Sequence, residues 1–301
     1  MTLLSGGVGG ARAARGFAAL LAPDELTVVV NVGDDDWMHG VHVSADIDTV
    51  VYTLAGVAGP HGWGRAGDTF AVMKALDRLG VDTTFRIGDL DLATCLVRTA
   101  ALSSGESLSS VTARIAASLG VGHRVLPATD DRLRTRVRLP DGEWLPFQDY
   151  FVIRRHEDEV SAVDYDGAES AKPAPGVVEA VSDADLVVIA PSNPPLSIWP
   201  ILAVTEIRDA VAAASRVVAV SPLFGGKALK GPADRVMSSL GLPPGTAGVL
   251  QAYRGLLDDL IVDLEDIKDA GGAAGVRIHA LDTRIAEPGA AARFAAEVLA
   301  L

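Results

Sequence analysis

Short runs of valine, isoleucine and leucine recur along this 301-residue chain, with stretches of helical character between them. Examples of the apolar runs are LTVVVNV (26–32), DLVVIAPSNPP (185–195) and RVVAVSPLFGG (216–226). Between the first two runs, the apolar residues of 47–54 are spaced i, i+3, i+4 and i+7, as on one face of a helix. Apolar strands that alternate with helices are typical of a parallel sheet covered on both faces. The sequence therefore predicts an α/β fold with a doubly wound, mainly parallel, Rossmann-like sheet.

Five loops rich in glycine or polar residues each follow one of the expected strands. They are SGGVGG (5–10), NVGDDD (31–36), RIGD (86–89), APSNP (190–194) and SPLFGG (221–226). In open parallel sheets, ligands bind outside the carboxyl ends of the strands. If the strands are parallel, all five loops open on the same edge, and we expect a ligand site there.

We expect a single α/β domain over residues 1–301, with an inserted hairpin or helical region at 125–176. In that region, TRVRLPDGEWLPF (135–147) indicates a β-hairpin that turns at residues 140–142. The other elements that matter below are helices expected at 11–21 and 68–80 and a strand expected at TTFRIGD (83–89).

The loop after the first expected strand contains four glycines and is followed by an arginine. The glycines are Gly6, Gly7, Gly9 and Gly10. Glycine lets backbone N–H groups approach an anion, the start of the next helix favours negative charge, and Arg12 adds a cation. We interpret this loop as a phosphate-binding turn, with a tight strand-to-helix turn as the alternative. It is not a dinucleotide fingerprint, because Arg12 occupies the third glycine position and Asn31, not an acid, closes the second strand.

Five aspartates follow the second expected strand within a short stretch. They are Asp34, Asp35, Asp36, Asp46 and Asp48. Hard divalent cations prefer carboxylate oxygens, and Mg²⁺ takes one or two from protein and the rest from water and phosphate. Acids at a strand edge that face an anion-binding loop would suit Mg²⁺ bound to a diphosphate. The alternative is that Asp46 and Asp48 complement the N-terminus of their own helix and the others are solvated.

The composition excludes several other classes of protein. A net charge of −13 argues against a protein that coats nucleic acid, which needs a basic face. Cys95 is the only cysteine, so no intrachain disulfide can form. We see no signal-peptide core at the N-terminus and no apolar run long enough to span a bilayer, so we expect a cytoplasmic protein without membrane contact.

Nine segments between about Leu3 and Asp263 resemble, in order, the 2-phospho-L-lactate transferase family of coenzyme F420 biosynthesis. They are SGGVGGAR, VVNVGDDDWMHG, DIDTVVYTLAG, HGWGRAGDTF, IGDLDLAT, LPATDDR, FQDYFV, APSNPPLSIWPIL and VVAVSPLFGGKALKGPA. The DIDT, SNP and FQD segments are the most specific. The resemblance implies transfer of a phospho-three-carbon-acid group, phospholactyl or phosphoenolpyruvyl, from a guanosine diphosphate diester to the deazaflavin FO. GMP is the other product, Mg²⁺ is the implied cofactor, and a homodimer is the implied assembly.

The resemblance also implies roles for particular residues. Asp48 in DIDT corresponds to the aspartate that contacts FO, and with Asp46 it forms the expected catalytic pair. The expected metal ligands are Asp34, Asp35 and Asp46. The other expected substrate-binding residues are the four glycines and Arg12, together with Trp63, Arg86, Ser192 and Asn193. The chain departs from the family pattern at Leu90 and Cys95, so no role is carried over to those two side chains.

Two other functions stay open at this level. A non-catalytic nucleotide or nucleotide-sugar binding regulator would share the glycine loop and the SNP segment without binding a deazaflavin. A nicotinamide oxidoreductase is disfavoured by the glycine spacing and by Asn31.

Overall fold

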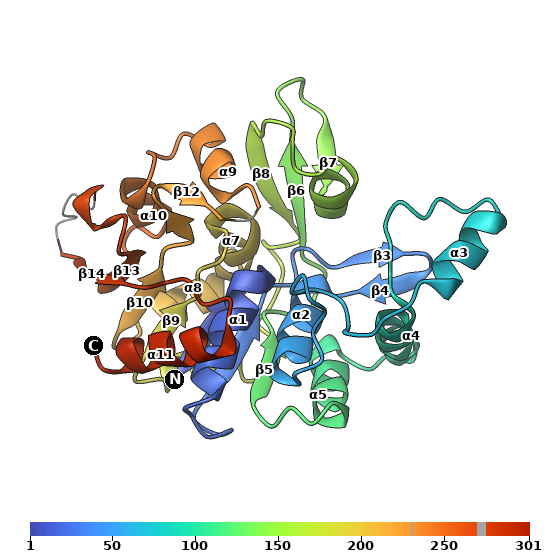
Figure 1. Ribbon diagram of the computed structural model, residues 1–301, viewed down its shortest axis with the longest axis horizontal. Helices are drawn as coiled ribbons and strands as arrows, with labels where there is room; N and C mark the ends of the chain where they lie inside the picture. The colour runs from blue at the N-terminus through green and yellow to red at the C-terminus, as the bar shows by residue number, and fades with distance from the viewer. Residues whose placement is uncertain (230, 270–274) are drawn as a thin grey trace.

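A seven-stranded parallel sheet forms the centre of the structure (Figure 1), a computed structural model that describes residues 1–229, 231–269 and 275–301. The strand order is β14-β13-β10-β9-β1-β2-β5, and all neighbouring strands are parallel. The bounds are β1 Thr2–Ser5, β2 Thr27–Val30, β5 Arg124–Pro127, β9 Val187–Ile189, β10 Val217–Val220, β13 Asp259–Asp263 and β14 Arg277–Leu281. The chain winds outward from β1 in one direction and from β9 in the other, which confirms the predicted doubly wound α/β fold. The order therefore reverses between β1 and β9, where ligands of such sheets bind.

Helices cover both faces of this sheet. In Figure 1, α1, α2 and α11 lie side by side on the face toward the viewer. On the opposite face α6 packs against α8, as right-handed crossovers in the other direction require. The helices of these layers are α1 Gly7–Ala18, α2 Ala45–Leu54, α6 Val177–Ser182, α7 Trp199–Leu202, α8 Thr205–Ala212, α10 Thr246–Ala252 and α11 Pro288–Leu299.

The core consists of the valine-rich strands and the small residues of α1. Every residue of β9 and β10 is buried, as expected for strands covered on both faces. Ala13 and Ala14 of α1 are buried as well, and a Cβ at Gly16 would lie 2.4 Å from the carbonyl oxygen of Ala291 on α11. Small side chains therefore bring α1 close to both the sheet and α11.

The first helix begins earlier than the sequence predicts. We expected it at 11–21, but α1 spans Gly7–Ala18. Most of the glycine segment is thus the first turn of the helix and not a loop before it. This places the positive end of the helix dipole directly at the carboxyl end of β1.

An arm extends from the β2–β5 side of the sheet (Figure 1) and contains the strands and helices between residues 36 and 103 other than α2. Its elements are β3 Asp36–Met38, β4 Val41–Val43, α3 Ala71–Arg78 and α4 Asp89–Ser103, and α5 Leu108–Ser118 packs on β5 of the main sheet. The expected helix at 68–80 is present as α3. The strand expected at 83–89 is wrong, because those residues form no strand and α4 already begins at Asp89.

Two aspartates explain why residues 83–89 are not a strand. Asp89 accepts hydrogen bonds from the N–H groups of Ala71 and Val72, at 2.9 and 3.0 Å, at the start of α3. Asp68 in turn accepts one from the N–H of Leu90, at 2.7 Å, at the start of α4. An aspartate beside each helix start thus caps the other helix, and the residues between the end of α3 and the start of α4 are held as a loop. The RIGD loop therefore does not follow a strand of the main sheet.

A small antiparallel sheet rises beside the carboxyl edge of the main sheet (Figure 1), in the order β7-β6-β8. Its strands are β6 Arg134–Arg138, β7 Trp144–Pro146 and β8 Ala162–Asp166. The predicted hairpin is confirmed by the pairing of β6 with β7. Residues 125–127, at the start of the expected insertion, belong to β5 of the main sheet.

The remaining short elements are the turns η1 Asp149–Ile153, η2 Pro194–Ile198 and η3 Ile267–Asp269, the hairpin of β11 Leu223–Phe224 and β12 Lys227–Ala228, and α9 Ala233–Ser239. Within the described ranges, no helix combines the length and apolarity needed to cross a membrane.

Candidate functional site

The segments that follow β1 and β9 meet where the strand order reverses. The hydroxyl of Ser192 donates to the carbonyl oxygen of Gly6 at 2.7 Å and accepts from the N–H of Gly6 at 3.3 Å. Asn193 accepts a hydrogen bond from the N–H of Leu196 at 3.2 Å and so caps η2. Ser192 therefore lies against the glycine segment, as the sequence suggested, while the Asn193 side chain shapes its own loop.

The glycines of α1 are required by close packing. A Cβ at Gly9 would lie 2.2 Å from the carbonyl oxygen of Pro191, and one at Gly10 would lie 2.3 Å from Oγ of Ser5. Gly7 has a φ of 64°, which side chains rarely adopt. The tight-turn interpretation thus holds, and it is compatible with anion binding, because Gly6 at the N-cap has no side chain and the dipole of α1 favours negative charge.

Asp46 links the glycine segment to the acids that follow β2. Its Oδ1 accepts a hydrogen bond from the N–H of Gly7 at 2.7 Å, and its Oδ2 accepts one from Asn31 Nδ2 at 2.9 Å. The same amide nitrogen lies 3.4 Å from Oδ1 of Asp34. The start of α1, the start of α2 and the end of β2 therefore share one buried polar network at a single rim of the sheet.

Asp35 forms a second group with His42 and Ser44. The hydroxyl of Ser44 donates to Asp35 Oδ2 at 2.8 Å, and Nε2 of His42 lies 4.0 Å from the same oxygen. Nη2 of Arg134, on β6, lies 3.3 Å from Nε2 of His42. Oδ1 of Asp35 is buried and has no partner in the described ranges. This carboxylate therefore has one oxygen left for a ligand.

Asp48 pairs with an arginine that the sequence analysis did not select. Arg98 of α4 is fully buried and its Nη2 contacts Oδ1 of Asp48 in a short ion pair. Its Nη1 donates to the carbonyl oxygen of His42 at 3.3 Å. Arg98 shares the buried stripe of α4 with Thr94, Cys95 and Ala101. An arginine within such a stripe is a signal that a buried acid faces it.

The two departures from the family pattern have different surroundings. Cys95 is fully buried, and its sulfur lies within 4.8 Å of carboxylate oxygens of Asp48 and Asp91. Tyr52 donates to Asp91 at 2.8 Å. Leu90, by contrast, is 42% exposed on the arm. Cys95 is therefore a neighbour of Asp48, whereas Leu90 is not.

The acids are buried with too little positive charge to balance them. Asp34, Asp35, Asp46 and Asp48 are each at most 7% exposed. Burial raises the pKa of Asp34, Asp46 and Asp48, and it raises the pKa of Asp35 to about 7. Burial, with the nearby Arg134, lowers the pKa of His42 to about 4, so His42 adds no cation at neutral pH. The cluster is suited to a hard cation, which would keep these carboxylates ionised.

A cavity of about 460 Å³ opens beside this cluster, between the loop after β2 and the small sheet. Its lining includes the acidic residues Asp34, Asp35 and Asp36 and a basic wall formed by Arg132, Arg134 and Arg136. Acidic and basic groups therefore line one space large enough for a small molecule.

Three further residues selected from the sequence lie outside the acid network. Trp63 is 59% exposed, on a loop where a Cβ at Gly62 would meet the side chain of Val8. Arg86 is exposed on the arm and stacks 4.2 Å from the ring centre of Phe70, and no contact with Asp48 is found in the described ranges. Arg12 is half-buried on α1 and has no ion-pair partner among the residues described. The structure thus brings Trp63 toward the glycine segment and leaves Arg86 on the arm.

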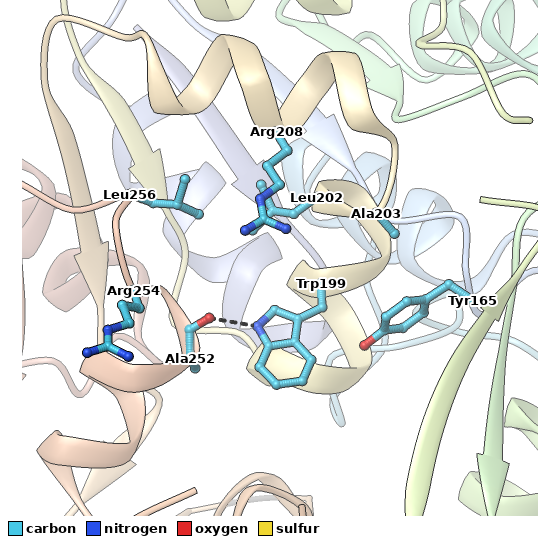
Figure 2. Close-up of a pocket in the computed structure, with 8 residues that line it drawn as sticks. All are labelled: Tyr165, Trp199, Leu202, Ala203, Arg208, Ala252, Arg254 and Leu256. Carbon is cyan, nitrogen blue, oxygen red and sulfur yellow. Dashed lines mark hydrogen bonds between the residues drawn. The ribbon is translucent and has the colours of Figure 1, made fainter. Parts of the chain in front are cut away.

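A second cavity of about 410 Å³ lies between α7, α8 and the end of α10 (Figure 2). Nε1 of Trp199 donates to the carbonyl oxygen of Ala252 at 3.0 Å in this cavity. Its lining includes Arg208 and Arg254 but none of the clustered aspartates or glycines. The cavity beside the acids is therefore the better candidate for the chemistry.

Fold and site together define a Rossmann-like α/β protein with a glycine-rich helix start and buried carboxylates at one rim of its sheet. Residues 1–292 match the family described as 2-phospho-L-lactate transferase CofD, and the chain belongs to this family of transferases.

Similar proteins from bacteria and archaea carry related names. The chain is 41% identical to a phosphoenolpyruvate transferase of Kitasatospora aureofaciens, over 99% of this chain and 96% of that protein. It is 39% identical to a 2-phospho-L-lactate transferase of Methanopyrus kandleri, with the same coverage. The fold is similar to that of a UPF0052 family protein from Bacillus halodurans, with a TM-score of 0.65, 18% identity and coverage of 99% and 98% of the two chains.

Proposed function

We propose that this chain transfers a phospholactyl or phosphoenolpyruvyl group from a guanosine diphosphate diester to the ribityl hydroxyl of FO. The hydroxyl attacks the phosphorus next to the three-carbon acid, the bond from this phosphorus to the bridging oxygen breaks, and GMP leaves with that oxygen. The observation that carries the proposal is the 2.7 Å hydrogen bond from Gly7 to Asp46, because it joins an anion-binding helix start to the acid cluster. The names of the family and of the similar proteins support the same reaction.

In this proposal Mg²⁺ is held by Asp34, Asp35 and Asp46. The donor set fits, because it consists of buried carboxylates and Oδ1 of Asp35 has no other partner within the described parts of the chain. The bound ion would neutralise charge on the diphosphate of the donor. The start of α1, with Gly6, Gly7, Gly9 and Gly10, would hold the diphosphate from the other side, assisted by Arg12 and by Ser192.

Asp48 is the group we assign to the acceptor. Oδ1 of Asp48 is held by Arg98, while Oδ2 is buried and has no hydrogen-bond partner among the residues that the structure describes. This free oxygen is suited to orient the ribityl hydroxyl and to accept its proton. Asp46 supports the site by fixing the N–H of Gly7 and the amide of Asn31. The exposed ring of Trp63 offers a face for the planar deazaflavin.

The direct test is incubation of the purified protein with FO, Mg²⁺ and each guanosine diphosphate diester, followed by mass analysis. We expect GMP and the phosphorylated deazaflavin product in equal amounts with at least one donor. Asp48→Asn is the matched variant, and it should bind donor without turnover. Donor binding without GMP release by the unmodified protein would instead favour the alternative, a non-catalytic nucleotide or nucleotide-sugar binding regulator.

We also propose that the protein is a cytoplasmic homodimer. Support comes from exposed apolar side chains on the arm, which a second copy would cover. They are Val72, Leu79, Val81, Leu90, Leu96 and Val97. Light scattering of the purified protein gives the mass that decides between one copy and two.

A further inference from the structure

Two guanidinium groups on the basic wall of the cavity beside the acids form no ion pair with any described residue. Arg132 is paired with Asp166 at 2.7 Å. Arg134 contacts the carbonyl oxygen of Leu133 and His42 and lies close enough to Asp35 to lower the pKa of that carboxyl. Arg136 contacts the ring of Trp144 and lies opposite Asp164 in the pairing of β6 with β8. Neither forms an ion pair in the part of the chain that the structure describes. In a chain of net charge −13, two such arginines that line one cavity point to an anionic ligand.

The strand that carries these arginines is fixed to the acid loop. The N–H of Thr135 donates to the carbonyl oxygen of Gly33 at 2.7 Å, and a Cβ at Gly33 would lie 2.4 Å from Oγ1 of Thr135. Nε2 of Gln148 donates to the carbonyl oxygen of Asp34 at 2.6 Å. Since side chains alternate along a strand, Arg134 and Arg136 flank the buried Thr135 and lie on the other face of β6. Hydrogen bonds to the backbone of the acid loop thus fix the position of Arg134 and Arg136 relative to the acid cluster.

The position of this basic wall along the sheet suggests which end of the donor it meets. Ser192 follows β9 and the glycine segment follows β1, whereas β6 contacts the loop after β2. A donor whose diphosphate lies at the glycine segment and the acids can place its guanosine toward β9 and its three-carbon acid toward β6. In a 2-phospho acid, the carboxylate is one carbon away from the ester oxygen, so it would be near the group that holds the phosphate.

We propose that Arg134 and Arg136 form a carboxylate-binding subsite for the three-carbon acid of the donor. This inference rests on the proposed function and adds to it the residues that recognise the transferred group. The carboxylate needs cations of its own, because Mg²⁺ and the start of α1 face the diphosphate. Guanidinium groups match a carboxylate through paired hydrogen bonds, which a lysine could not reproduce.

The test compares two ligands, the donor diester and GDP, which lacks the carboxylate. Their dissociation constants are measured by calorimetry with Mg²⁺ for the unmodified protein, Arg134→Gln, Arg136→Gln and the double variant. Arg138→Gln is the control, because Arg138 lies on the same face of β6 but is exposed and does not line the cavity. We expect each cavity variant to bind the donor about 10- to 100-fold more weakly, as for a lost charged hydrogen bond, with unchanged GDP binding. The control should behave as the unmodified protein.

Three results would overturn the inference. Equal weakening of donor and GDP would mean that the arginines act on the diphosphate or on the fold. Unchanged donor binding in the double variant would mean that they contact neither. In both cases GMP release by the unmodified protein leaves the proposed function standing. Absence of GMP release from every donor would reject the proposed function, and the carboxylate subsite with it.

Discussion

Arg98 and Asp48 are a buried cation and a buried acid that depend on each other. Burial alone would lower the pKa of Arg98, but its contact with Asp48 raises that pKa above the ordinary value. Burial raises the pKa of Asp48, and Arg98 opposes that rise. The two side chains are in direct contact, and removing one partner would leave the other buried without it. In the proposed mechanism Arg98 is a positioning residue, because it acts through Asp48.

Arg98→Met is expected to destabilise the protein by about 3–5 kcal/mol, the usual cost of breaking a buried ion pair from one side. Adding Asp48→Asn to this variant should recover much of that stability, because the unpaired charge is then removed. Turnover should be lost in both variants, whereas Arg98→Lys, which keeps a cation, should recover part of it. Urea unfolding and GMP release measured on the same samples would check this. Recovery of activity in the double variant would show that the pair serves the fold alone.

At the scale of elements, Asp259 joins three strands at the edge of the sheet opposite the site. Asp259 opens β13 and is fully buried. It accepts hydrogen bonds from Arg216, which precedes β10, at 2.9 Å, and from Arg277 and His279 of β14, both at 2.7 Å. The cluster lies at the amino-terminal ends of these strands, away from the site at their carboxyl ends. Its role is therefore to hold β10, β13 and β14 in register.

Because of this cluster, the free energy of unfolding should decrease as the pH is lowered into the acid range. Burial alone would raise the pKa of Asp259, but the hydrogen bonds from Arg277, His279 and Arg216 hold it below its ordinary value. An acid whose pKa is lower in the folded state stabilises the fold at a pH above its unfolded pKa, about 3.9. This stabilisation is lost as the pH falls below that value toward the folded pKa. We expect Asp259→Asn to cost about 3 kcal/mol at neutral pH and progressively less below about pH 4. Urea unfolding between about pH 3 and about pH 7 tests this, with the exposed Asp24→Asn as control. A cost that stays constant with pH would contradict it.

The elements that sequence reasoning identified are those with local causes. The valine runs of β2, β9 and β10 bury all or nearly all of their side chains, so composition alone marks them as central strands. Residues 83–89 were misassigned because what prevents a strand is the exchange of caps between Asp68 and Asp89, which are distant in sequence.

The candidate site shows the same division between local and distant causes. The glycines and acids stand out because each group is contiguous in sequence. Arg98 was missed because its partner, Asp48, is 50 positions away on another helix. Arg134 and Arg136 gain their significance only when Thr135 pairs with Gly33, about a hundred residues earlier in the chain. Contacts of this kind follow from the packing of elements and have no local pattern.

At the scale of the whole molecule, the acid cluster gathers segments that the fold brings together from several elements. Asp34 and Asp35 follow β2, Asp46 opens α2, and Gly7 opens α1. Their burial without matching cations opposes folding, because like charges repel and each carboxylate loses hydration. In the proposed function, a bound cation and the donor would offset this unfavourable free energy.

Magnesium should therefore stabilise the entire fold and not only the loops that bind it. An ion that binds only the folded state adds RT ln(1 + [L]/Kd), or about 2.7 kcal/mol at a concentration of 100 Kd, so Mg²⁺ should raise the thermal midpoint and EDTA should reverse the rise. Asp34→Asn and Asp35→Asn should lose this response, yet in EDTA they should be at least as stable as the unmodified protein, because one repelling charge is gone. Thermal unfolding with and without Mg²⁺ measures both effects, and Asp24→Asn should keep the full response. An equal rise in all variants would place the ion elsewhere. Lower stability of both variants in EDTA would show that these carboxylates stabilise the fold without a metal.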